Sequence, residues 1–144
     1  MKRNYKVTQG ISLEIDGLNL DLYNNYSLDE FAVSAMVREV ILRFRLECPI
    51  VDTPRPECFS VLFRGVTFFE TSYPTLGDEA GVVDEVGFKE RHDRDLAWLK
   101  QDGQELPEDD IILRISGGRY IRLAAEASEV RLAEASATMQ PAHC

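Results

Sequence analysis

His92, Asp93 and Asp95 are the first residues whose types and spacing could carry chemistry. A histidine titrates near neutral pH, and with an adjacent carboxylate it can act as a general acid–base pair. The same three residues also suit the polar start of a helix, and this is the interpretation we favour. Cys58 could be a nucleophile, but Arg55 and Arg64 are its only basic neighbours in sequence. A structural thiol is therefore the better interpretation of Cys58.

A set of acidic residues forms the second candidate site. Carboxylates that converge can bind a hard divalent cation, but the spacing of an EF-hand loop is missing, and a solvated acidic face is favoured. Such a face could also meet a basic protein. The candidate partner-binding residues are Asp78, Glu79, Asp84, Glu85, Glu108, Asp109 and Asp110.

Arginines are predicted on the outward faces of several strands. They could hold an anionic ligand, but pairing with the acidic segment 78–110, folded over the same face, is the simpler expectation. These residues are Arg43, Arg45, Arg114 and Arg122.

Motifs for the common cofactors are missing from the sequence. It contains neither glycine-rich nucleotide-binding pattern, no G-x-S-x-G elbow and no Cys-x-x-Cys or His-x-x-x-His spacing. We therefore expect no cofactor, no metal site and no catalytic residue.

The net charge of −9 is concentrated in one segment. Residues 70–110 hold thirteen acids and four bases, a net of −9, while the flanking segments nearly balance. Nucleic acid and anionic membrane surfaces are disfavoured as partners, because both require clustered Lys and Arg.

The three cysteines are too few for a disulfide framework. Strand parity turns Cys48 inward and Cys58 outward, so we expect both to be reduced thiols. No apolar signal or membrane-spanning stretch is evident, and a cytoplasmic location is the expectation.

Two hairpins and one central strand dominate the predicted structure. Asp16-Gly17 is a type I′ turn dipeptide that pairs Ile15 with Leu18 in a hairpin over residues 11–22. A three-residue turn at 116–118 gives a second hairpin over residues 111–125. Between them, the stretch 58–70 is a strand with a β-bulge at Gly65, which would turn its large residues to one side. These are Phe59, Val61, Phe63, Val66 and Phe68.

The remaining elements complete a mainly β chain. Residues 36–47 form a strand antiparallel to the central one, residues 82–88 a short edge strand, and residues 93–100 a short helix, whereas residues 23–30 form a loop. We predict a curved antiparallel sheet or small sandwich of six to eight strands with one helix, α+β at the margin. Residues 1–133 form one domain and residues 134–144 a frayed tail.

These features favour a non-enzymatic binding or accessory module whose acidic surface meets a basic partner. In general type, the sequence is similar to many bacterial immunity and accessory proteins. The alternatives are a small-molecule or divalent-metal-dependent enzyme, with its site between the arginine-bearing face and the acids, and a homo-oligomer formed through a sheet edge.

Overall fold

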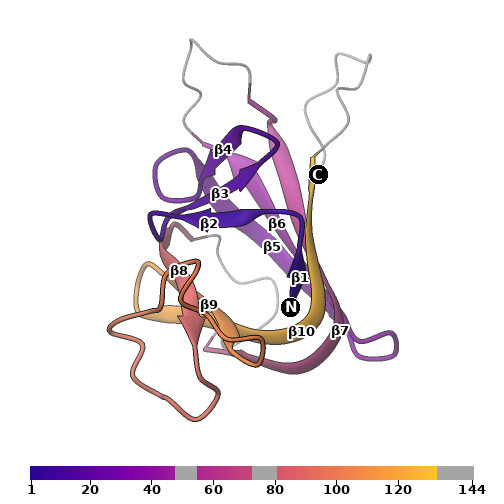
Figure 1. The fold of residues 1–144 in the computed structure, drawn as a ribbon. Coiled ribbons are helices and arrows are strands. Elements are labelled where there is room, and N and C mark those ends of the chain that lie inside the picture. The colour runs from indigo at the N-terminus through magenta and orange to yellow at the C-terminus, as the bar shows by residue number, and fades with distance from the viewer. Residues whose placement is uncertain (48–54, 73–80, 133–144) are drawn as a thin grey trace.

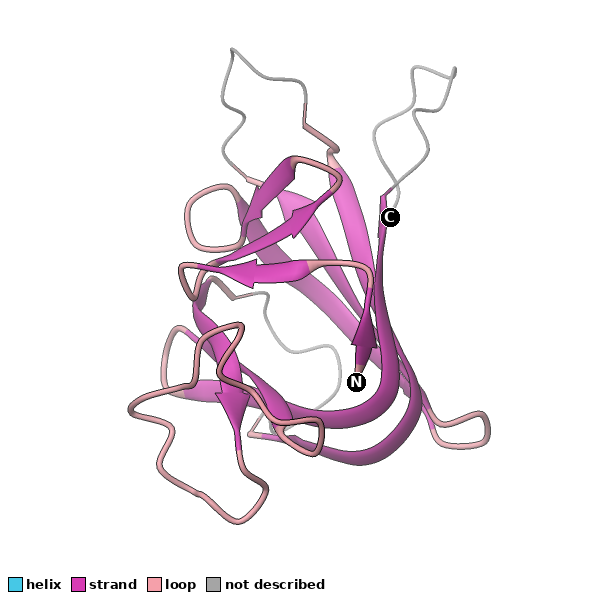
Figure 2. Cartoon of the chain, viewed as in Figure 1, coloured by secondary structure: helices cyan, strands magenta, loops and turns pink. Residues whose placement is uncertain are grey.

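A computed structural model describes residues 1–47, 55–72 and 81–132, and these residues form a curled antiparallel β-sheet closed by a smaller sheet (Figure 1). The prediction of a mainly β fold is confirmed. The described residues contain strands and loops with no helix, so the helix predicted at 93–100 is wrong (Figure 2). The ten strands are β1 Lys2–Arg3, β2 Lys6–Thr8, β3 Ser12–Ile15, β4 Leu18–Asp21, β5 Tyr26–Ser34, β6 Glu39–Leu46, β7 Cys58–Thr71, β8 Val83–Lys89, β9 Asp110–Ile115 and β10 Arg119–Leu132.

The large sheet has the order β5-β6-β7-β10-β9-β8, and β1 adds a parallel partner to β10. Leu28 of β5 forms an isolated bridge with Gly81, just before β8, so the two edges of the curled sheet approach each other there. The small sheet, β2-β3-β4, lies across the concave side (Figure 1). Strand β5 begins at Tyr26, which corrects the loop predicted for residues 23–30.

Both predicted hairpins are confirmed in register. Ile15 pairs with Leu18 across Asp16 and Gly17, whose φ angles of 50° and 79° are those of a type I′ turn. The second hairpin pairs Ile111 with Leu123, which leaves residues 116–118 as its three-residue turn.

The break in alternation near Gly65 is confirmed, but it differs in detail from the prediction. Gly65 has a φ of 61°, and Val66 lies against the core, as predicted. The register shift against β10 falls two residues later, since Ala124 pairs with Phe68 and Ala125 with Val66. This second irregularity turns Phe69 toward the core. The guanidinium of Arg91 lies over the ring of Phe68, 3.9 Å from its centroid. The prediction that Phe68 faces the core is therefore wrong.

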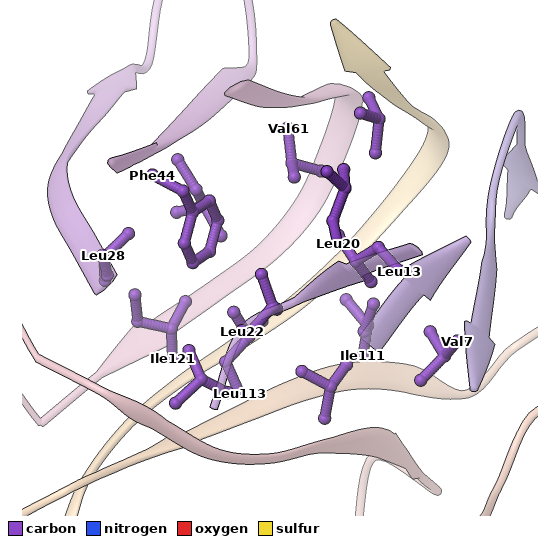
Figure 3. Packing of buried hydrophobic residues seen from close by; sticks show 14 of the residues in the cluster. Val7, Leu13, Leu20, Leu22, Leu28, Phe44, Val61, Ile111, Leu113 and Ile121 are labelled. Atoms are coloured by element: carbon purple, nitrogen blue, oxygen red, sulfur yellow. The ribbon is translucent and has the colours of Figure 1, made fainter. Parts of the chain in front are cut away.

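The hydrophobic core fills the space between the two sheets (Figure 3). The small sheet contributes Val7, Leu13 and Leu20, and the large sheet contributes Phe44 and Ile121 among others. Burying each such side chain stabilises the fold by roughly 1.5–3 kcal/mol. The remaining labelled members of the cluster are Leu22, Leu28, Val61, Ile111 and Leu113.

Cys58 is buried and disulfide-bonded, which corrects the prediction of a reduced thiol. Cys58 lies opposite Arg45, on the face that strand parity predicted, but both faces are buried at the start of β7, where Cys58 and Phe59 are adjacent buried residues. Cys48 and Cys144 lie outside the described residues, as does the predicted tail 134–144. Disulfides persist mainly in oxidising compartments. The cysteines therefore no longer support the predicted cytoplasmic location.

Candidate functional site

Five of the seven predicted acidic residues lie among the described residues, and they differ in exposure. Asp78 and Glu79 lie outside the described residues. Asp84 and Glu108 are exposed. The structure corrects the prediction that all seven lie outside the core, because Asp109 is only 5% exposed and Asp110 is fully buried.

Strand register places the described members of this set at two ends of one strand pair. Glu85 is opposite Arg114, whereas Lys89 is opposite Asp110. The stretch from Glu85 to Lys89 spans roughly 13 Å at the usual rise of a strand. The described acids therefore fall into two groups, one beside Glu85 and one beside Asp110.

The connection between β8 and β9, residues 90–109, is the most distinctive feature near these acids. It is twenty residues long, and its only strand-like pairing is the bridge from Lys100 to Phe88. Figure 1 shows it protruding beside β8 and β9. Connections longer than about 12–15 residues without regular structure are uncommon and are often functional. We call residues 90–109 the β8–β9 loop.

The predicted helix is replaced by local side-chain hydrogen bonds within this loop. Asp93 Oδ1 accepts from the Asp95 amide and Asp95 Oδ1 from the Ala97 amide, both at 2.9 Å. The Asp93 carbonyl, which would accept the first helical hydrogen bond from Ala97, instead accepts from Arg122 Nη1 at 2.8 Å. An isolated eight-residue helix is only marginally stable, so these competing bonds decide the conformation.

Arg122 of β10 is the main anchor of the near half of the loop, residues 90–98. Its Nε donates to Asp110 Oδ2 at 2.6 Å, and both side chains are buried. Its Nη2 donates to the carbonyls of Glu90, at 2.6 Å, and Arg91, at 2.9 Å. Arg91 Nε in turn lies 2.9 Å from both Asp110 oxygens. The fixed fork of the guanidinium thus holds three loop carbonyls and one carboxylate together.

Two lysines add a second set of contacts. Lys89 is 1% exposed, and its Nζ lies 3.1 Å from Asp93 Oδ2 and 3.5 Å from the ring centroid of Trp98. The hydrogen bond from the Asp95 amide has the largest effect on the pKa of Asp93 and lowers it. The hydrogen bond from Lys89 lowers it further. Lys100 Nζ lies 2.9 Å from Asp109 Oδ2, and this hydrogen bond raises the pKa of Lys100. The loop is therefore held in one conformation chiefly by charged groups.

The predicted pairing of arginines with the acidic segment is half right. Arg122 pairs with Asp110, and Arg114 pairs with Glu85. Arg43 instead pairs with Glu30 on neighbouring β5. Arg45 likewise contacts β5 through Asp29, and also Glu47. The outward strand face is therefore divided into separate local ion pairs.

Ion pairing within the described residues neutralises most of the acids between residues 81 and 110. Of the ten acids in this range, seven are in salt bridges. Their cations include Arg3, Lys89, Arg91 and Lys100, none of which the sequence pattern assigned to this role. Asp84, Asp95 and Glu108 have no salt bridge among the described residues and are open to solvent or a partner.

The β8–β9 loop also exposes apolar side chains. Trp98 is 54% exposed and Leu106 is 47% exposed. The sequence pattern placed Trp98 at the flank of a helix. The signal that could have located this surface was the combination of an unusually long, acid-rich segment with a tryptophan.

Ser128 and Tyr5 form a buried hydroxyl pair beside a groove. The groove encloses about 220 Å³ beside β1, β7 and β10. Ser128 Oγ lies 2.9 Å from Tyr5 Oη, but burial raises the pKa of Tyr5 to about 12. Tyr5 therefore stays protonated at neutral pH and cannot activate Ser128 as a base would. The groove is lined by Lys2, Arg3, Asn4, Leu62, Arg64, Ala127, Ser128 and Glu129.

Three further findings concern possible functions. Among residues 1–47, 55–72 and 81–132, no group of three His, Cys, Asp or Glu side chains is arranged to hold a metal ion. The same residues include no helix long and apolar enough to span a membrane. No protein-family model, curated protein or solved structure matches the chain.

Proposed function

We propose that this chain is a non-enzymatic protein-binding domain that presents the β8–β9 loop to a basic partner. One observation carries the proposal: a twenty-residue loop is fixed by buried ion pairs while Trp98 and Leu106 stay exposed on it. Fixing a loop in advance lowers the entropic cost of binding. Tryptophan is also enriched among the residues that dominate binding energy.

Charge supports the choice of partner. The loop has seven acids and three bases, a net of −4, and its exposed acids include Asp95 and Glu108. Such a surface would steer a basic protein toward the loop and raise the association rate. In this proposal Asp109 and Asp110 position the loop, and Glu108 contacts the partner. Asp84 and Glu85 lie at the periphery of this surface, and Asp78 and Glu79, outside the described residues, stay predicted partner contacts.

A loop variant with a matched control tests the proposal. We would combine Glu108→Lys with Trp98→Ala, and compare it with Glu14→Lys combined with Tyr23→Ala. The control reverses one exposed acid and truncates one exposed aromatic, 51% exposed, in a segment far from the loop in sequence. A partner captured from the native organism would be identified by mass spectrometry and its association rate measured with each variant.

The expected result is an association rate at least tenfold slower for the loop variant at low salt, with a smaller difference at high salt. The control should bind at the rate of the original protein. A loop variant that keeps the original rate contradicts the proposal. Loss of binding in both variants would place the partner elsewhere.

Self-association through a sheet edge remains a separate prediction, and β5 offers one such edge. β5 ends the strand order of the large sheet, and Glu30, Ala32 and Ser34 are exposed along it. A cytoplasmic location and the exclusion of nucleic acid and membrane surfaces also stay predictions, and only the charge distribution supports the last two.

A further inference from the structure

The far half of the β8–β9 loop, residues 101–108, is tied to the N-terminal strands. Arg3 Nη2 lies 3.0 Å from Asp102 Oδ1 and 2.8 Å from Glu105 Oε1. Asp102 Oδ2 also accepts a 2.7 Å hydrogen bond from the amide of Val7. These two carboxylates are thus bound by residues about 100 positions away in the sequence.

The N-terminal strands are themselves fastened to β10. The Asn4 side chain donates to the Val130 carbonyl at 3.1 Å and accepts from the Val130 amide at 2.8 Å. Lys2 pairs with Ala127 and Arg3 with Ser128 in the parallel β1–β10 ladder. Only two residues of β1 pair with β10, so this ladder is short.

Arg3 is well placed to transmit the order of β1 to the loop. Its side chain is 12% exposed, and its guanidinium lies 4.8 Å from the ring centroid of Phe88 on β8. A bidentate, largely buried arginine pair has a narrow range of geometries. A shift of β1 would therefore release Glu105 and leave Asp102 with only the Val7 amide as its partner from the N-terminal strands.

The two halves of the loop differ in what holds them. Arg122 binds the near half directly from the centre of the large sheet. The far half depends on Arg3, which reaches the large sheet through the two-residue strand β1, and on the Val7 amide of β2, which pairs with β3. We infer that β1 is a clasp for the far half: detaching residues 1–4 releases residues 101–106 while the near half keeps its conformation.

This inference concerns the same loop as the proposed function, and its importance for binding rests on that proposal. If a partner contacts the far half, then β1 and the partner are linked. A partner that binds the closed loop more tightly would favour the docking of β1 on β10 by some factor. Loss of β1 would then lower the affinity for that partner by the same factor.

Hydrogen–deuterium exchange of the full chain without a partner tests the clasp directly. In Arg3→Gln, the amides of residues 101–106 should exchange at least tenfold faster, while those of residues 90–98 and of β3–β4 keep their rates. The matched control is Arg94→Gln, which removes the exposed pair between Arg94 and Glu70. It should leave residues 101–106 unchanged.

Unchanged exchange at residues 101–106 in Arg3→Gln would overturn the inference. If Arg3→Gln instead unfolds the whole domain, Asp102→Asn decides, because it keeps Arg3 and removes only the loop carboxylate. Regional acceleration at residues 101–106 in that variant supports the clasp, and unchanged or uniform exchange overturns it. The readout needs no partner, so failure of the clasp and failure of the binding proposal are distinguishable.

Discussion

The β3–β4 hairpin and the β8–β9 loop show two different ways of fixing a segment. Each pair in the hairpin joins residues within about ten positions, around a turn whose two central residues have positive φ. The loop is fixed by Arg3 from one end of the described chain and Arg122 from the other. The hairpin is therefore encoded locally, and the loop only through the assembled sheet.

The two regions also differ in the forces that hold them. Leu13 and Leu20 of the hairpin are buried apolar side chains, so water exclusion stabilises their arrangement. The pair between Arg122 and Asp110 buries two charges, whose desolvation offsets much of their attraction. Such a pair contributes little net stability when intact, but losing one partner leaves the other charge buried.

The largest effect is expected from Arg122→Met. It leaves Asp110 with Arg91 as its remaining cation and removes three donors to loop carbonyls, so we expect a loss of about 3–5 kcal/mol in the free energy of unfolding. Urea denaturation measures this. The control is Arg43→Met, whose pair with Glu30 is exposed and should cost at most about 1 kcal/mol. Equal losses in both variants would contradict the anchoring role of Arg122.

A smaller loss is expected from Gly17→Val in the hairpin. Gly17 has a φ of 79°, and a Cβ added there would meet no atom beyond its chain neighbours within 4 Å, so backbone strain is the main cost. We expect about 1–3 kcal/mol from urea denaturation. Asp16→Asn should be nearly neutral, because asparagine tolerates the same conformation. A neutral Gly17→Val would show that the turn does not determine the hairpin.

The smallest effect concerns acid pH and the far half of the loop. Burial raises the pKa of Asp102, but the hydrogen bonds from Arg3 and the Val7 amide outweigh it, so the pKa lies below its ordinary value. The stability from Asp102 is then complete above the unfolded-state pKa of about 4 and is lost as pH falls through the lower folded-state pKa. The difference in Tm between the original protein and Asp102→Asn should shrink as pH falls below about 4. A constant difference would contradict this pairing.

The β3–β4 and β9–β10 hairpins could be predicted because turn chemistry and alternation agreed on one register. The sequence could not exclude the helix at 93–100, because the residue that donates a hydrogen bond to the Asp93 carbonyl is Arg122, 29 positions away. Phe68 was misplaced for a similar reason. Its side is set by a second irregularity in the pairing of β7 with β10, which one strand's pattern does not reveal.

The candidate site shows the same division. The sequence located the excess negative charge in residues 70–110, but its pattern indicated that Asp109 and Asp110 are exposed. Hydropathy classifies an aspartate as a surface residue, and only a facing cation makes its burial tolerable.

The sequence by itself determined the β character of the chain, the registers of two hairpins and the position of the acidic segment. Each of these depends on neighbours within about a dozen residues. Tertiary structure decided which acids are buried, where the long loop lies and which residues remain exposed on it. Those outcomes depend on Arg3 and Arg122. Both contact the loop or its flanking Asp110 only when β1, β9 and β10 come together in the folded sheet.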